Sequence, residues 1–246
     1  MESAEASNSR PWADEPFQLI PLSILECKVR ILIRRVLATS VSPANNCLQP
    51  GEKVKPSYHM AYEMLLAHNL FLRGINSIYL QCINIEKSPT DILAFVNYAS
   101  CWSRILHHHH AAEETFLFPE IEKLTGKPGL MDINVNQHHG FQQGLENYEK
   151  YLESVKSTRA QYQGAKLKEI IDSFMPILQE HLVEEIVTLK VLEEYEDKVD
   201  LAKWTSDVSS KITKDAQTPD GMVSLYPSVS YKTVELEELI HPNEGD

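Results

Sequence analysis

The chain lacks the features that mark extracellular, membrane-spanning or nucleic-acid-binding proteins. Its four cysteines form no CxxC pair, so the spacing of a zinc ribbon or a redox motif is missing. No run of about 18 uncharged apolar residues is present, so no membrane-spanning helix is expected. Basic residues number 23 against 35 acidic ones, and the net charge of −12 argues against broad binding to nucleic acid or to anionic membranes. The acidic N-terminus shows no secretory signal, and we expect a cytoplasmic protein.

Motifs for the common organic cofactors are also missing. The apolar stripes contain no recognisable cofactor motif, so haem, flavin and nucleotide binding are not indicated. What the chain does contain is a hydrophobic content of 43%, ordinary for a soluble protein, arranged largely at helical spacing. These properties predict an all-α protein that can bury a substantial core.

Four long stretches have the helical spacing of apolar residues. The second has the clearest limits, because Ser88 and Pro89 suit the start of a helix and Gly126 and Pro128 suit its end. Short connections between long helices make antiparallel neighbours. We therefore predict an up-down-up-down four-helix bundle. Its helices are expected at about 57–86, 88–126, 130–156 and 165–195.

The predicted bundle, residues 57–204, lies between two segments of different character. Residues 1–56 read as an extended leader with Trp12, Phe17 and Ile20 as possible anchors, an amphipathic helix at 22–37, and a loop. Residues 205–246 are acidic and contain several prolines, which predicts an irregular tail that is partly extended or disordered.

Histidine and glutamate recur at a spacing that suits metal binding. His109 and Glu113 are four residues apart, so a helix presents the imidazole and the carboxylate on one face. His181 and Glu185 repeat this spacing on the last predicted helix. Two such pairs on two helices suggest a metal held between helices.

One histidine falls near the middle of the apolar stripe of each predicted helix. A buried histidine or glutamate costs free energy unless it is paired or bound to metal. Four imidazoles and two carboxylates exceed the needs of one tetrahedral zinc ion and suit two first-row ions that share a carboxylate. Iron fits this donor set best, while zinc and manganese are not excluded. The candidate ligands are His68, His109, Glu113, His138, His181 and Glu185.

The run of four histidines leaves the phase of the second helix open. His109 with Glu113 is our preferred pair, and His110 with Glu114 is the alternative, rotated by about 100°. In either phase His107 and His108 cannot both face the site, and we expect them to be solvated or to support a ligand from outside. His139 is similarly expected to be an outward or supporting neighbour of His138.

Three motifs together resemble the hemerythrin-like HHE cation-binding domain, its fungal members in particular. They are HHxxEExxLFP at 109–119, QHHGF at 137–141 and HLVEEI at 181–186, with flanking likeness at 12–21 and 68–81. The resemblance implies a non-haem di-iron site with His68, His109, His138 and His181 as imidazole ligands, and with Glu113 and Glu185 as carboxylate ligands. It implies that Glu113 bridges the two ions. Segment 22–56 looks like an insertion relative to the family.

One position departs from the oxygen-carrying hemerythrins. They have a further histidine one turn before the third-helix ligand, where this chain has Asn134. The loss of an imidazole weakens the case for reversible oxygen storage. Three functions stay open: a di-iron protein that reacts with dioxygen or peroxide, as an oxidoreductase if it is an enzyme; a non-catalytic iron-sensing, oxygen-sensing or metal-storage module; and a purely structural bundle.

Overall fold

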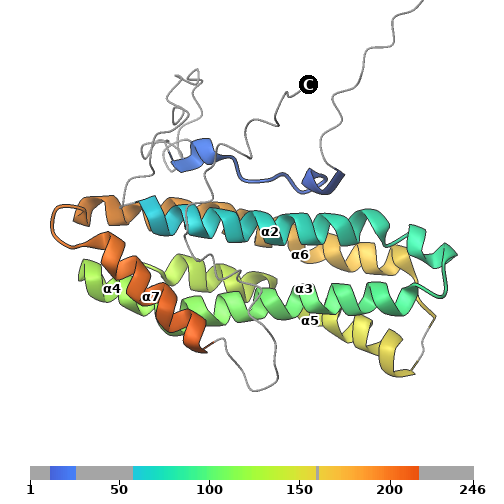
Figure 1. Ribbon diagram of the computed structural model, residues 1–246. Coiled ribbons are helices and arrows are strands. Elements are labelled where there is room, and N and C mark those ends of the chain that lie inside the picture. The colour runs from blue at the N-terminus through green and yellow to red at the C-terminus, as the bar shows by residue number, and fades with distance from the viewer. Residues whose placement is uncertain (1–11, 26–57, 159–160, 216–246) are drawn as a thin grey trace, which may run out of the picture.

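The computed structural model describes residues 12–25, 58–158 and 161–215. Within these residues, long helices lie antiparallel in the order of the chain (Figure 1). They are α2 (His59–Gln81), α3 (Ile92–Ala112), α5 (Asp132–Thr158) and α6 (Gly164–Leu189). A π-helical turn, η5 (Glu113–Leu117), joins α3 to α4 (Phe118–Thr125) so that the three form one helical run. The prediction of an all-α, up-down-up-down bundle is confirmed.

The helix limits differ from the predicted ones in detail. The first helix is shorter than the predicted range of 57–86. α2 ends at Gln81, and a 3-10 turn, η4 (Asn84–Lys87), follows it. Ser88 does not cap α3 directly: its hydroxyl donates to the Asp91 carboxylate at 2.5 Å, and the helix begins at Ile92. The end of the run is as predicted, since Gly126 takes the left-handed conformation with φ of 65° after α4. The last pattern divides into α6 and a 3-10 segment, η6 (Lys190–Tyr195).

The predicted irregular tail begins as a helix. Residues Leu201–Asp215 form α7, which crosses the run of α3 and α4 (Figure 1). Leu201, Thr205 and Val208 are buried at helical spacing, and residues 201–215 are not acidic, with three lysines against two aspartates. The prediction of irregular structure from 205 onward is therefore wrong for residues 205–215, and residues 216–246 lie outside the described part.

The described part of the leader lies along α2 (Figure 1). It contains two 3-10 turns, η1 (Trp12–Asp14) and η2 (Leu22–Leu25). Asn69 and Asn76, two turns apart on α2, hold it: Asn69 exchanges hydrogen bonds with the backbone of Ile20, and Asn76 does so with Phe17. Ile20 is buried, and Phe17 packs edge-on against a tyrosine of α2, so both act as anchors. The amphipathic helix predicted at 22–37 falls mostly outside the described residues.

Two glycines allow neighbouring helices of the bundle to approach each other closely. A β-carbon at Gly144 of α5 would lie 2.5 Å from the β-carbon of Phe174 on α6. A β-carbon at Gly74 of α2 would lie 2.6 Å from Trp102 of α3, whose indole N–H donates to the Phe71 carbonyl at 3.0 Å. These contacts leave little room between helix pairs, so side chains one or two turns further along must meet. Among the described residues, no helix is long and apolar enough to cross a membrane.

Candidate metal centre

Seven buried polar side chains meet between the four helices near the end of α3. Each is at most 7% exposed, although histidine and glutamate are seldom fully buried without a partner. α2 and α5 provide one histidine each, the end of α3 and the start of η5 provide three residues, and α6 provides two. They are His68, His109, His110, Glu113, His138, His181 and Glu185.

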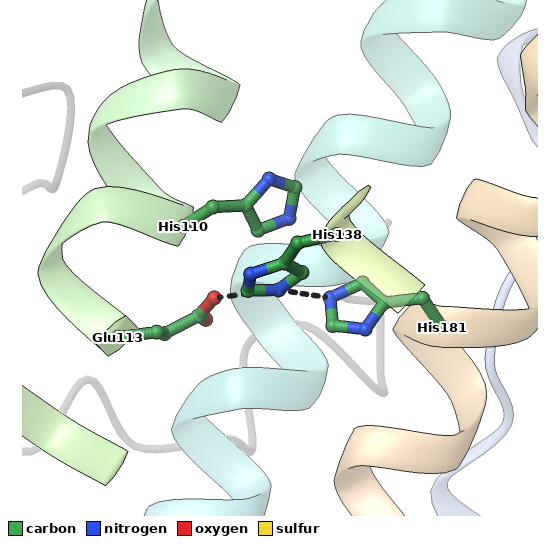
Figure 2. Close-up of side chains that lie close together, drawn as sticks. All are labelled: His110, Glu113, His138 and His181. Carbon is green, nitrogen blue, oxygen red and sulfur yellow. Dashed lines mark hydrogen bonds and ion pairs between the residues drawn. The ribbon is translucent and has the colours of Figure 1, made fainter. Parts of the chain in front are cut away.

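The side chains form two groups of possible metal ligands. In each group, one ligand atom from every residue lies within 4.8 Å of the others. The first group is His110, Glu113, His138 and His181, and Figure 2 shows these four side chains converging from α3, η5, α5 and α6. The second group is His68, His109, Glu113 and Glu185. Only Glu113 belongs to both, so its two oxygens can serve two ions.

All six residues proposed from the sequence lie in these groups, the preferred pair His109 and Glu113 among them, and His110 lies there as well. Both histidines enter the site. The His109 ring packs against His68 at 5.2 Å between centroids, and the His110 ring packs against His138 at 4.3 Å. Glu114 does not replace Glu113; it is 40% exposed and contacts the far side of His138.

His110 was considered from the sequence only as the alternative to His109, because one histidine per helix was expected. Glu113 comes four residues after His109 and three after His110, and both spacings place a carboxylate beside a histidine on a helix. A helix enclosed by three others has an inward sector wide enough for two neighbouring residues to face different helices. His109 faces α2, and His110 faces α5 and α6. The sequence feature that indicates two inward histidines is that Glu113 follows His109 by four residues and His110 by three.

Outer hydrogen bonds orient three of the imidazoles. His68 Nδ1 lies 2.6 Å from the Leu182 carbonyl oxygen, which can only accept, so the proton is on Nδ1. His138 Nδ1 lies 2.6 Å from a Glu114 oxygen. His181 Nδ1 lies 3.3 Å from Gln137 Oε1. In all three the Nε2 atom turns inward.

A chain of side chains supports the orientation of His181. Gln137 Nε2 donates to a Glu184 oxygen at 2.6 Å, which leaves Gln137 Oε1 as the acceptor for the imidazole. Glu184 thus supports His181 through Gln137.

The inward Nε2 atoms of His138 and His181 face each other, and neither carries a proton that could form a hydrogen bond between them. His138 and His181 both carry their protons on Nδ1, yet their Nε2 atoms are 3.1 Å apart (Figure 2). Two nitrogen lone pairs at this distance repel unless a cation or a proton lies between them. The oxygens of Glu113 and Glu185 are buried and accept no hydrogen bond from the described part of the chain, although His109 Nε2 is 2.8 Å from Glu113 Oε1. This donor set therefore fits a bound metal cation.

Burial keeps the imidazoles in the form that binds metal. Loss of solvent lowers the pKa of His109, His110 and His181 well below the usual histidine range, and neighbouring histidines lower it further. Burial also lowers the pKa of His138, against the opposing effect of Glu114. Burial, and then the charge of Glu185, raises the pKa of Glu113. The site thus favours neutral imidazoles at His109, His110 and His181, and a nearby positive charge would favour the ionised form of Glu113.

The remaining histidines near the run lie outside both groups. His107 is 46% exposed, and its Nε2 lies 3.1 Å from a Glu149 oxygen on the surface. His108 and His139 are exposed. This agrees with their predicted outward placement.

Comparison with known proteins agrees with the site. Residues 59–190 match the hemerythrin HHE cation-binding domain, which covers all seven side chains and more than half of the chain. The chain belongs to the hemerythrin HHE family. Its resemblance to that family, stated from sequence motifs, is confirmed.

One curated relative of this hemerythrin-family chain comes from the fungus Cryptosporiopsis sp. (strain 8999). It is named dimeric xanthone biosynthesis cluster protein R11, and the two chains are 36% identical over 149 residues. The aligned part covers 61% of this chain and 56% of the relative, so the chain spans little more than half of that protein. No solved structure matches the chain.

His110 changes the interpretation of Asn134 in this hemerythrin-family chain. The position one turn before His138 carries no imidazole, and one ligand group was expected to lack a histidine for that reason. The first group nevertheless contains three imidazoles, because His110 enters it from α3. The number of imidazoles therefore gives no reason to regard this group as incomplete.

Proposed function

We propose that the chain holds two iron ions and reacts with dioxygen or peroxide. The observation that supports this most directly is that Glu113 belongs to both ligand groups. A carboxylate shared by two four-residue groups suits a pair of ions bridged through its oxygens. The groups together contain five imidazoles, two carboxylates and no thiolate, a nitrogen-rich set that suits iron.

The protein's own residues would position and shield the metal pair. His110, His138 and His181 would hold one ion and His68, His109 and Glu185 the other, with Glu113 between them. Iron at such a site supplies one-electron redox chemistry and open positions for a small ligand. Because all seven side chains are at most 7% exposed, the surroundings favour dioxygen or peroxide over a large molecule as the direct partner.

Two forms of this chemistry differ in the step after oxygen binds. As an enzyme, the chain would be a non-haem di-iron oxidoreductase. The name of the fungal relative links that protein to a biosynthetic cluster for dimeric xanthones, which favours oxidation of an aromatic compound. As a sensing or storage module, the chain would change its packing when metal binds, because a cation relieves the repulsion between the opposed lone pairs of His138 and His181.

Metal loading under nitrogen tests the proposal. The purified chain should bind about two ferrous ions, and admission of air should produce near-ultraviolet and visible charge-transfer bands. Manganese and zinc are loaded in parallel to compare stoichiometry and affinity. Stoichiometric zinc binding together with iron binding that gives no optical response to air would contradict the proposal. Turnover of peroxide or an aromatic compound would favour the enzyme.

A further inference from the structure

Asn134 is a buried amide whose hydrogen-bonding capacity is unused. Its side chain is 0% exposed, and neither its oxygen nor its nitrogen has a hydrogen-bond partner among the residues that the structure describes. Leaving such a group unsatisfied costs free energy, and buried polar groups in folded proteins are almost always paired. Asn76, the other fully buried asparagine described, shows the usual situation: both of its amide atoms are hydrogen-bonded to the leader.

The register of the helices places Asn134 at the metal centre. It precedes His138 by four residues on α5, so both lie on the same face of the helix. Contacts with α6 run antiparallel: Gly144 meets Phe174, and His138 meets His181. Because the two helices are antiparallel, the residue one turn before His138 on α5 lies level with the residue one turn after His181 on α6. Asn134 is therefore level with Glu185.

Contacts between α5 and the helical run of α3, η5 and α4 place Asn134 at the same level. His138 Nε2 lies 3.6 Å from Glu113 Oε2, and its Nδ1 contacts the next residue, Glu114. Because α3 and α5 are antiparallel, a residue one turn before His138 lies beside the π-helical turn that carries Glu113. Asn134 is therefore enclosed at the carboxylate level of the site, one turn from the imidazole level.

We propose that the Asn134 amide hydrogen-bonds a small exogenous ligand at the position formed by His110, Glu113, His138 and His181. The proposal rests on the proposed function and extends it by naming the residue that binds the ligand. Three imidazoles and one carboxylate leave an ion of higher coordination number with an open position. The amide can donate two hydrogen bonds and accept two. It suits a small anion or an uncharged oxygen species, and it takes no proton from either.

Azide affinity of the ferric protein tests the proposal, because azide is a small anion that accepts hydrogen bonds. Wild type, Asn134→Leu and the smaller Asn134→Ala are loaded with iron, their iron content is measured, and azide is titrated by absorbance at constant pH. Loss of one hydrogen bond should weaken azide binding roughly 5- to 10-fold in both variants, with iron content unchanged. Asn134→Leu should also raise the melting temperature of the metal-free protein by about 2–4 °C, because it removes an unsatisfied buried amide.

Asn76→Leu is the matched control. It removes an asparagine whose hydrogen bonds are complete, so it should lower the melting temperature and leave azide affinity per iron unchanged. Unchanged azide affinity in the two iron-loaded Asn134 variants would overturn the proposal. Loss of iron from both variants would also overturn it, since the amide would then be needed for the metal itself. Failure of the wild type to bind iron would overturn the proposed function, and this proposal with it.

Discussion

His109 and His110 are neighbours in the chain but belong to different ligand groups. The His109 Nε2 atom lies 3.2 Å from His68 Nε2, whereas the His110 ring packs against the His138 ring at 4.3 Å between centroids. Glu113, one turn later, belongs with both. One short stretch of helix thus serves two metal positions. The turn after it is π-helical, a departure from α geometry that is frequent at functional sites.

Replacing His110 should empty one metal position and spare the other. His110→Ala removes an imidazole from the first group only, because the second group does not contain it. Metal content after gel filtration should fall from about two to about one ion per chain, as counted by elemental analysis. His107→Ala is the control, since His107 contacts surface Glu149 and should leave the content unchanged. Two retained ions in His110→Ala would show that this side chain is not a ligand.

Replacing Glu114 should weaken metal binding without removing a ligand. Glu114 accepts a hydrogen bond from His138 Nδ1 at 2.6 Å, which orients the ring and makes its Nε2 more basic. Glu114→Gln should lower metal affinity by about 10- to 100-fold, as measured by competition with a chelator. Glu149→Gln is the matched control, because Glu149 contacts only the exposed His107 among the histidines of the run. Equal affinities in the two variants would contradict a role for Glu114 in positioning.

Metal should be retained at mildly acidic pH and lost at lower pH. Ligating imidazoles must be neutral, and burial lowers the pKa of His109, His110 and His181 below the usual value near 6.5. Protonation of these three imidazoles therefore competes with metal binding only below that value. The raised pKa of Glu113 acts in the opposite sense, because its carboxyl must lose a proton to bind metal and holds that proton to higher pH. Dialysis at a series of pH values should show metal retained at about pH 6.5 and released toward pH 4. Full retention at about pH 4 would argue against histidine ligation.

Gly144 should be intolerant of a methyl group while Gly140 tolerates one. A β-carbon at Gly144 would lie 2.5 Å from Phe174 Cβ, a contact that a helix shift must relieve. At Gly140 it would lie 3.3 Å from a side-chain methyl of Ile177. Gly144→Ala should cost about 1–3 kcal/mol in the free energy of unfolding. Gly140→Ala should change it by less than about 1 kcal/mol, because the helix gains from alanine. Thermal melts of both variants measure the difference, and equal melting temperatures would contradict the close packing of α5 on α6.

Much of the fold could be predicted from the sequence because helical spacing and end signals act locally. The bundle topology agrees with four periodic stretches and short connections, and Gly126 ends α4 as its backbone freedom suggests. The errors also have local causes. α7 was not predicted because residues 205–246 were judged as a whole by their acidic composition, and the stripe of Leu201, Thr205 and Val208 was given less weight. Burial of that stripe depends on helices that are distant in the sequence, so the residues around it do not reveal it.

Local spacing is enough to identify the helices that carry candidate ligands, since a separation of four residues puts His109 with Glu113 and His181 with Glu185 on one helical face. Tertiary packing is what turns His110 inward as well, because two neighbouring residues can both be buried when different helices enclose each of them. It also decided which nitrogen of each imidazole faces the centre, through partners as distant in sequence as Leu182 is from His68. The unpaired amide of Asn134 likewise becomes visible only once every neighbour is in place.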